Sequence, residues 1–354
     1  MLRIRKGMML AIFCVILTVA GCDRKAAPEP IPDNGNNQPV EKIRPASLVI
    51  GTASLGGTYH VYGRAWAALA EEALGIPVRV EETGGPIHNL IFVHHGYFML
   101  GMTTLGPAYE AWFGREDWTR GREHRDIRAL FPMFNTYFHW LADRDSGIRT
   151  LRDMHGKRVG SGPPGGTIGT AGPRIFSLLG IAPTLEHGGI GELVAMQARG
   201  QLDANGIAAG IPVPSFRDYE EAKGSENVVF IGVEGEEREL IKTTWPYFTD
   251  ALIPAGTYKA LKNDLQTFGV WNVAIASKFL DDQMAYELVK AVMENNEYMV
   301  TQHAAAKETL VQNLNNIYII PLHPGAIRYY KEQGIEIPEH LLPPEYQQTE
   351  GGSN

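Results

Sequence analysis

The sequence predicts an α/β protein of two lobes joined by a hinge that the chain crosses twice. Short apolar runs alternate with helical segments, which is the pattern of a sheet flanked by helices. A strand–loop–helix unit that begins at residue 47 has a counterpart at residue 158, so each unit can start its own lobe. The apolar run 269–276 is placed to return the chain to the first lobe. With 354 residues and 44% hydrophobic content, the chain is long enough for two cores.

The first lobe is expected to begin with a strand at 47–51 and a Gly-rich loop at 52–58. A helix follows, because apolar side chains recur at spacings of three and four residues: Tyr59, Tyr62, Trp66, Leu69 and Ala73. After a strand at 78–80, Pro86 suits the first turn of a second helix, and Gly96 lies where that helix would end.

The rest of the chain continues this alternation. The expected elements are strands at 98–102, 140–142 and 158–159, a Gly-rich loop at 160–172, a helix at 175–179, a strand and loop at 203–210, a strand at 269–276 and a helix at 282–303. We therefore expect lobe 1 to comprise 46–138 and 268–345, and lobe 2 to comprise 139–267.

The N-terminus has the pattern of an export signal. Three basic residues precede an apolar run of residues 8–20, which is too short to cross a bilayer. The following Val-Ala-Gly-Cys resembles a lipoprotein cleavage site, so residues 1–21 are expected to be a signal peptide and Cys22 the lipidated residue. An ordinary signal peptide is the alternative. The acidic Asp23 resembles an inner-membrane retention signal, which would place the protein on the periplasmic side of that membrane.

The segment after Cys22 and the extreme C-terminus are polar. Residues 22–45 are rich in Pro, Asn, Glu and Lys, so they are expected to form a flexible tether. Residues 346–354 are expected to be a disordered tail.

Cysteine content and charge exclude some classes of function. Cys14 lies in the signal and Cys22 at the anchor, so no thiol remains for a disulfide or a cysteine-based metal site. The formal net charge is −8, which argues against binding to nucleic acid.

Three Gly-rich strand-to-helix connections, at 54–58, 83–86 and 160–167, are the candidate binding elements. A helix start offers unpaired N–H groups and partial positive charge, so it can bind a carboxylate or phosphate without a cationic side chain. Each loop alone is more typical of a tight turn. Three of them at the carboxyl ends of strands favour an anion-binding cleft between the lobes.

The sequence lacks the motifs that would indicate nucleotide binding or catalysis. The sequence has no phosphate-binding G-x-x-x-x-G-K-[ST] and no nucleophile elbow, so we expect neither a nucleotide cofactor nor catalysis. His88, His94 and His95 lie close together but without nearby acids, and we expect no metal site there. Arg64 and Arg174 either pair with a second acidic group on the ligand or lie on solvated helix faces.

Taken in order, the motifs resemble the TAXI family of TRAP-transporter solute receptors. They span 47–334, and the matching segments are Gly-Gly-Thr-Tyr at 56–59, Thr-Gly-Gly at 83–85, Asn-Leu at 89–90, Gly-Met at 101–102, Asp-Ala at 203–204, Gly-Ile-Pro at 210–212, Ile-Pro-Ala-Gly-Thr-Tyr at 253–258 and Pro-Leu-His-Pro-Gly-Ala at 321–326.

The resemblance implies a type II periplasmic-binding-protein fold, a ligand such as glutamate, glutamine or a related dicarboxylate, and delivery to a sodium-coupled TRAP permease. By position, the implied ligand contacts are Ser54, Gly57, Thr58, Tyr59, Asn89 and Thr103 in lobe 1, and Gly165, Gly166, Thr167, Ala209 and Gly210 in lobe 2.

Three positions depart from the family pattern. The second-lobe loop lacks a common serine before Thr167, His60 replaces a common tyrosine, and Pro86 replaces a serine. We therefore expect a receptor for a small carboxylate, without assuming glutamate. The alternatives are a lipoprotein that reports ligand occupancy to a membrane sensor kinase, and an enzyme built on the same fold.

Overall fold

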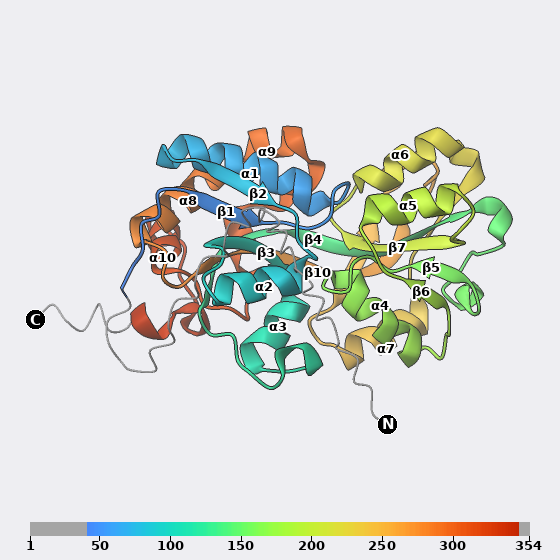
Figure 1. The fold of residues 1–354 in the computed structure, drawn as a ribbon, viewed down its shortest axis with the longest axis horizontal. Coiled ribbons are helices and arrows are strands. Elements are labelled where there is room, and N and C mark those ends of the chain that lie inside the picture. The colour runs from blue at the N-terminus through green and yellow to red at the C-terminus, as the bar shows by residue number, and fades with distance from the viewer. Residues whose placement is uncertain (1–40, 347–354) are drawn as a thin grey trace, which may run out of the picture.

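The computed structural model describes residues 41–346, whose strands form one mixed sheet running through two lobes (Figure 1). The strand order is β2-β1-β3-β10-β4-β7-β5-β6, with β8 paired to β4 and β9 paired to β10. Within this part of the chain, no helix is long and apolar enough to cross a membrane. The expected signal, Cys22 and residues 347–354 of the expected tail lie outside the described residues.

Lobe 1 has three parallel strands with helices above and below them (Figure 1). Its strands are β1 (Leu48–Gly51), β2 (Val78–Glu81) and β3 (Leu100–Thr104), and its helices are α1 (Thr58–Leu74), α2 (Pro86–His94), α3 (Leu105–Phe113), α8 (Asp282–Glu294), α9 (Asn296–Gln302) and α10 (Pro324–Glu332). Helices α1 and α8 lie on one face of this sheet, and α2 and α3 on the other.

Lobe 2 repeats this arrangement with its own strands and helices. They are β5 (Arg158–Gly160), α4 (Thr167–Leu178), β6 (Thr184–Glu186), α5 (Ile190–Ala198), β7 (Ala204–Ala209), α6 (Pro214–Lys223), β8 (Val228–Ile231), α7 (Gly235–Thr244) and β9 (Thr249–Ile253). Short 3-10 helices occur at Asp117–Thr119, Arg144–Ser146, Arg152–Met154, Ser225–Asn227, Ala304–Glu308, Val311–Asn316 and Glu339–Leu341.

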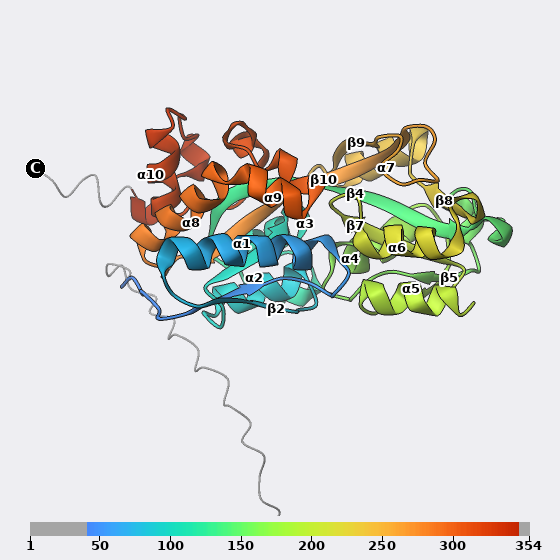
Figure 2. The ribbon, with the colours of Figure 1, turned by 90° about the horizontal axis from the view of Figure 1, so that it is seen from above.

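Two long antiparallel strands, β4 (Ile127–Asp143) and β10 (Leu265–Ser277), carry the chain between the lobes (Figure 2). One end of β10 pairs with β3 of lobe 1, and the other end pairs with β9 of lobe 2. Strand β4 pairs with β7 and β8 of lobe 2 at its C-terminal end. The predicted two-crossing hinge is therefore present. The expected lobe boundaries, 138/139 and 267/268, fall inside these strands and remain a prediction.

Three element predictions were wrong in extent. Strand β4 covers 17 residues instead of the expected 140–142, because it is buried on both faces and so lacks a polar–apolar alternation. Helix α4 begins at Thr167 instead of 175 and contains Pro173, which we had expected to precede the helix. The expected helix 282–303 is interrupted at Asn295, where α8 ends and α9 begins.

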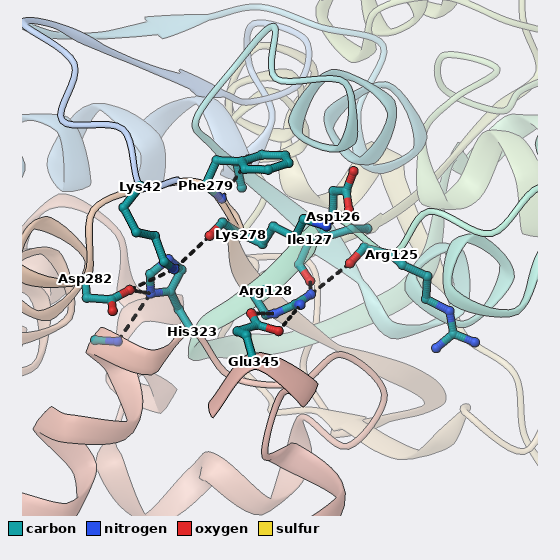
Figure 3. A network of polar contacts seen from close by, with 12 residues as sticks. Lys42, Arg125, Asp126, Ile127, Arg128, Lys278, Phe279, Asp282, His323 and Glu345 are labelled. Carbon is teal, nitrogen blue, oxygen red and sulfur yellow. Dashed lines mark hydrogen bonds and ion pairs between the residues drawn. The ribbon is translucent and has the colours of Figure 1, made fainter. Parts of the chain in front are cut away.

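Both ends of the described chain are bound to lobe 1 (Figure 3). Lys42 Nζ lies 2.8 Å from Asp282 Oδ1 and donates to the carbonyl of Lys278. The backbone N–H of Ile43 donates to the Phe279 carbonyl. Residues 41–45, which we expected to belong to the flexible tether, thus contact the end of β10 and the start of α8.

The C-terminal segment makes a similar attachment. Glu345 forms a bidentate ion pair with Arg128 of β4, and both N–O distances are 2.6 Å. The Arg128 side chain is only 4% exposed, so this pair is largely shielded from solvent. Tyr346, expected to begin the disordered tail, accepts a hydrogen bond from Lys331.

We predict that the protein loses stability on acidification because two buried histidines are held neutral. Burial lowers the pKa of His139 and of His303 from 6.5 to about 4. Between these values the unfolded chain binds protons that the folded chain does not, so the free energy of unfolding should fall by a few kcal/mol from about pH 7 to about pH 4.5. Urea unfolding at a series of pH values measures this.

The variant His303→Asn removes one of these groups and should show a shallower decline in the free energy of unfolding. Equal stability of the parent protein at both ends of that pH range would contradict the prediction.

Candidate ligand-binding site

A cavity lies between the lobes, close to the hinge strands. It contains about 490 Å³ of space free of atoms, part of it open to solvent. The lining residues come from lobe 1, lobe 2 and β10: Ala53, Ser54, Gly57, Thr58, Tyr59, Pro86, Pro163, Gly166, Thr167, Ile168, Ile190, Ile207, Ala208, Ala209 and Asn272. None of these described lining residues carries a charge.

Four helices begin at the cavity wall, two from each lobe. Their first residues are Thr58 of α1, Pro86 of α2, Thr167 of α4 and Ile190 of α5. The residue before each helix is a glycine, which has no side chain to cap the start, although at α5 Ser54 accepts from the Ile190 N–H. Uncapped first turns leave backbone N–H groups available and add partial positive charge, so the arrangement can bind an anionic group from both lobes.

Tyr59 and Asn272 form the buried inner end of the site. The Tyr59 hydroxyl donates to Asn272 Oδ1 at 2.5 Å. Asn272 Nδ2 donates to the Phe134 carbonyl at 2.7 Å and to the Thr136 hydroxyl at 2.6 Å. Burial raises the pKa of Tyr59 well above its usual value, so the phenol stays neutral. Its proton points to the hinge, and its oxygen and ring remain for a ligand.

A bulge in the hinge explains the orientation of Asn272. The pairing of β10 with β4 shifts register between Trp271 and Val273, so β4 has one extra residue there. The Asn272 amide donates to β4 at this irregularity instead of pointing into solvent.

The lobes also touch each other directly around the cavity. Thr58 Oγ1 donates to the Gly210 carbonyl at 2.7 Å, and the hydroxyls of Thr104 and Thr167 lie 3.1 Å apart. The N–H of Ile190 donates to Ser54 Oγ at 3.3 Å. The structure is therefore a closed form, in which the side-chain hydroxyls of the site already have partners.

Four of the expected contact residues do not line the cavity. Asn89 is fully buried, and its amide donates to the carbonyls of Thr52 and Met102 at 2.8 Å. Thr103 is also fully buried, in β3. The Gly165 carbonyl accepts from Ile87, and Gly210 accepts from Thr58 as described above. The other seven, Ser54, Gly57, Thr58, Tyr59, Gly166, Thr167 and Ala209, lie at the cavity.

Sequence reasoning missed Asn272 and the isoleucines of the cavity. The sequence did contain a signal for Asn272, because it is a polar residue inside the apolar strand 269–276. A buried amide needs hydrogen-bond partners, so such a residue indicates a specific polar contact. Ile168, Ile190 and Ile207 are at most 8% exposed and gave no signal, because isoleucine is the expected residue of any core.

A separate ion pair joins the lobes away from the cavity. Arg174 of α4 lies 2.6 Å from Glu110 of α3 and 3.2 Å from Glu116. Trp118 donates to the other Glu110 oxygen at 2.6 Å. Burial raises the pKa of Glu110, and the opposing effects of Arg174 and Trp118 do not fully offset it. Arg174 therefore bridges the lobes, while Arg64 is exposed.

The described residues contain no grouping of three His, Cys, Asp or Glu side chains that could hold a metal ion. Among the histidines weighed for this role, His88 accepts from the N–H of Gly84 and packs beside Phe92.

We predict that Gly85→Ala hinders closure of the lobes. Gly85 has φ +101°, and a Cβ there would lie 3.1 Å from the Cα of Gly166 in the opposite lobe. The added methyl group should hold the lobes apart, and small-angle X-ray scattering should detect a larger radius of gyration.

Gly75→Ala is the matched control. It also requires a positive φ, of +65°, but its Cβ would meet nothing within 4 Å. Equal radii of gyration for the two variants would contradict the prediction.

We also predict that Tyr59→Phe destabilises the fold by about 1–3 kcal/mol, because Asn272 Oδ1 would lose its donor in a buried place. Urea unfolding measures the loss. Tyr286→Phe removes an exposed hydrogen bond to Glu332 and should cost less. Similar losses in both variants would refute a special role for the Tyr59–Asn272 pair.

Comparison with known proteins agrees with this architecture. MatC from Rhodopseudomonas palustris, solved with bound malate, is 15% identical, with 81% of this chain and 99% of MatC covered at a TM-score of 0.54. The periplasmic binding protein BugD is 13% identical, with 87% of this chain and 98% of BugD covered at a TM-score of 0.51. At such identities the likeness establishes the fold alone.

The fold is thus the type II periplasmic-binding-protein fold that the sequence predicted. A family model described as NMT1-like matches residues 50–334, which include both lobes, the hinge and every residue of the cavity. This chain belongs to the NMT1-like family.

Proposed function

We propose that this protein is an extracytoplasmic solute-binding receptor that captures a small carboxylate between its lobes. The observation that carries the proposal is the cavity at the hinge, where uncapped helix starts from both lobes meet. Such receptors bind and release a solute without changing it covalently, and the proposal therefore assigns no catalytic step. The fold shared with MatC, which holds malate, is compatible with this class of ligand.

In this proposal the first turns of α1 and α4 hold the carboxylate. The first residues of both turns line the cavity, from opposite lobes, and hydrogen bonds to an ionised acceptor are about twice as strong as those between neutral groups. The site around the backbone N–H groups of these turns is lined by Ser54, Thr58, Tyr59, Thr167 and Ala209.

The buried residues behind the cavity have supporting roles. Asn89 joins the start of α2 to β3 and to the end of β1 through the Met102 and Thr52 carbonyls, and the carbonyls of Gly165 and Gly210 are the acceptors of cross-lobe hydrogen bonds. Thr103 is a buried residue of β3.

Binding would couple to closure because the ligand bridges the lobes. The cross-lobe bonds of Thr58, Thr104 and Ser54 form only when the lobes meet. A ligand that contacts both lobes shifts the population toward this closed form. The closed surface is then what a membrane partner recognises.

The partner and location rest on the sequence resemblances. The TAXI-like motifs support delivery to a TRAP-type permease, and the cleavage-site pattern at 19–22 supports export and lipid attachment at Cys22. Together they support a location on the periplasmic side of the inner membrane.

We predict selective stabilisation by a carboxylate. The full-length chain in detergent, freed of co-purified ligand by denaturing and refolding, is screened by thermal unfolding against small mono- and dicarboxylates and their amides. A ligand at 100 times its Kd should stabilise the protein by about 2.7 kcal/mol, because it binds only the folded state.

Thr58→Val should reduce the shift, because it removes the hydroxyl that holds Gly210 across the cleft. Thr301→Val, on the exposed end of α9, is the matched control and should keep the shift. A screen in which amides stabilise the protein as well as their carboxylates, or in which no carboxylate does, would reject the proposal.

A further inference from the structure

The residues that line the cavity restrict the ligand more narrowly than the helix starts do. On the proposed function, one carboxylate is held by the backbone of α1 and α4. The remaining question is what the rest of the cavity wall can hold. Its side chains are largely apolar: Ala53, Pro86, Pro163, Ile168, Ile190, Ile207, Ala208 and Ala209.

Most polar side chains of the wall already donate hydrogen bonds within the protein. The Thr58 hydroxyl donates to Gly210, the Tyr59 hydroxyl donates to Asn272, and both donor positions of the Asn272 amide are used within the hinge. The Thr104 and Thr167 hydroxyls bond each other. Ser54 Oγ accepts from the N–H of Ile190. In the closed form the wall therefore offers a second anionic group only neutral hydroxyl protons, from Ser54 and from one member of the Thr104–Thr167 pair, and no cationic side chain.

Two charged side chains on the elements that form the cleft, Arg174 and Glu82, are bonded elsewhere. Arg174 lies behind Thr170 on α4 and pairs with Glu110 and Glu116 in a different pocket. The acidic Glu82 accepts from the N–H of Leu55 at the back of the first loop. Neither a second carboxylate nor an ammonium group would therefore find an opposite charge among the described residues that line the cavity.

Desolvating an unpaired charge is costly, whereas an aliphatic group gains from contact with isoleucine. We infer that the neutral, isoleucine-lined cavity selects a monocarboxylate with a short aliphatic body, and rejects dicarboxylates and amino acids. Ile168, Ile190 and Ile207 are the specificity-determining residues, because they form the apolar wall on the lobe 2 side.

Ligands of equal shape and different charge test this inference. In 4-methylpentanoate an isopropyl group occupies the place of the second carboxylate of succinate, and 3-methylbutanoate relates to malonate in the same way. Isothermal titration of the full-length, ligand-stripped chain should give Kd values at least about tenfold lower for the branched monocarboxylates than for the dicarboxylates. The amide 4-methylpentanamide should bind more weakly than 4-methylpentanoate.

A variant of the apolar wall supplies the second readout. Ile190→Thr should reduce the preference for 4-methylpentanoate over succinate, because a hydroxyl replaces apolar surface at the cavity. Ile335→Thr makes the same change in a partly buried position outside the cavity and should keep the preference.

The outcomes separate this inference from the proposed function. Tighter binding of succinate or malonate would overturn the inference and leave the carboxylate receptor standing. Equal binding of 4-methylpentanoate and its amide would overturn both. Failure of all these compounds to bind would also overturn the inference, and the wider carboxylate screen would then decide the proposed function.

Discussion

The structure depends on the antiparallel pairing of β4 with β10. These two strands are the only described segments through which the chain passes from one lobe to the other, and they belong to the sheets of both. Because both strands pass side by side from one lobe to the other, they give the lobes one shared axis, although their pairing shifts register at two places. Asn272 lies at the irregularity in this pairing, and through Tyr59 it joins the axis to the first turn of α1. The inner end of the cavity is therefore formed by the hinge, while its outer walls belong to the two lobes.

The electrostatics of closure and of ligand binding are separated in space. The cross-lobe ion pair of Arg174 with Glu110 joins α4 to α3, on the other side of Thr167 and Thr170 from the cavity. The cavity itself relies on backbone dipoles and neutral groups. Closure can thus be stabilised by an ion pair without placing a cation next to the ligand, so the strength of closure and the choice of ligand can change independently.

Much of the fold could be predicted from the sequence, because helix periodicity and Gly-rich turns are local signals. The helix carrying Tyr59 and the loop 54–58 were predicted for this reason, and both reach the cavity. The position of Asn89 could not be predicted from local sequence patterns. It lies in a Gly-rich region typical of binding, yet its amide is bound by carbonyls of two other segments, residues 52 and 102, whose approach no local pattern encodes. The start of α4 was missed because Pro and Gly dominate its sequence, although tertiary packing keeps it helical.

The attachment of both chain ends to lobe 1 has a mechanical consequence. Lys42 and Ile43 bind beside the end of β10, and Glu345 binds Arg128 near the start of β4 (Figure 3). A pulling force applied to either end of the described chain therefore acts on lobe 1, and lobe 2 carries none of that force. On the proposed function, tension on the chain upstream of residue 41 would therefore not oppose the movement of lobe 2 during opening and closing.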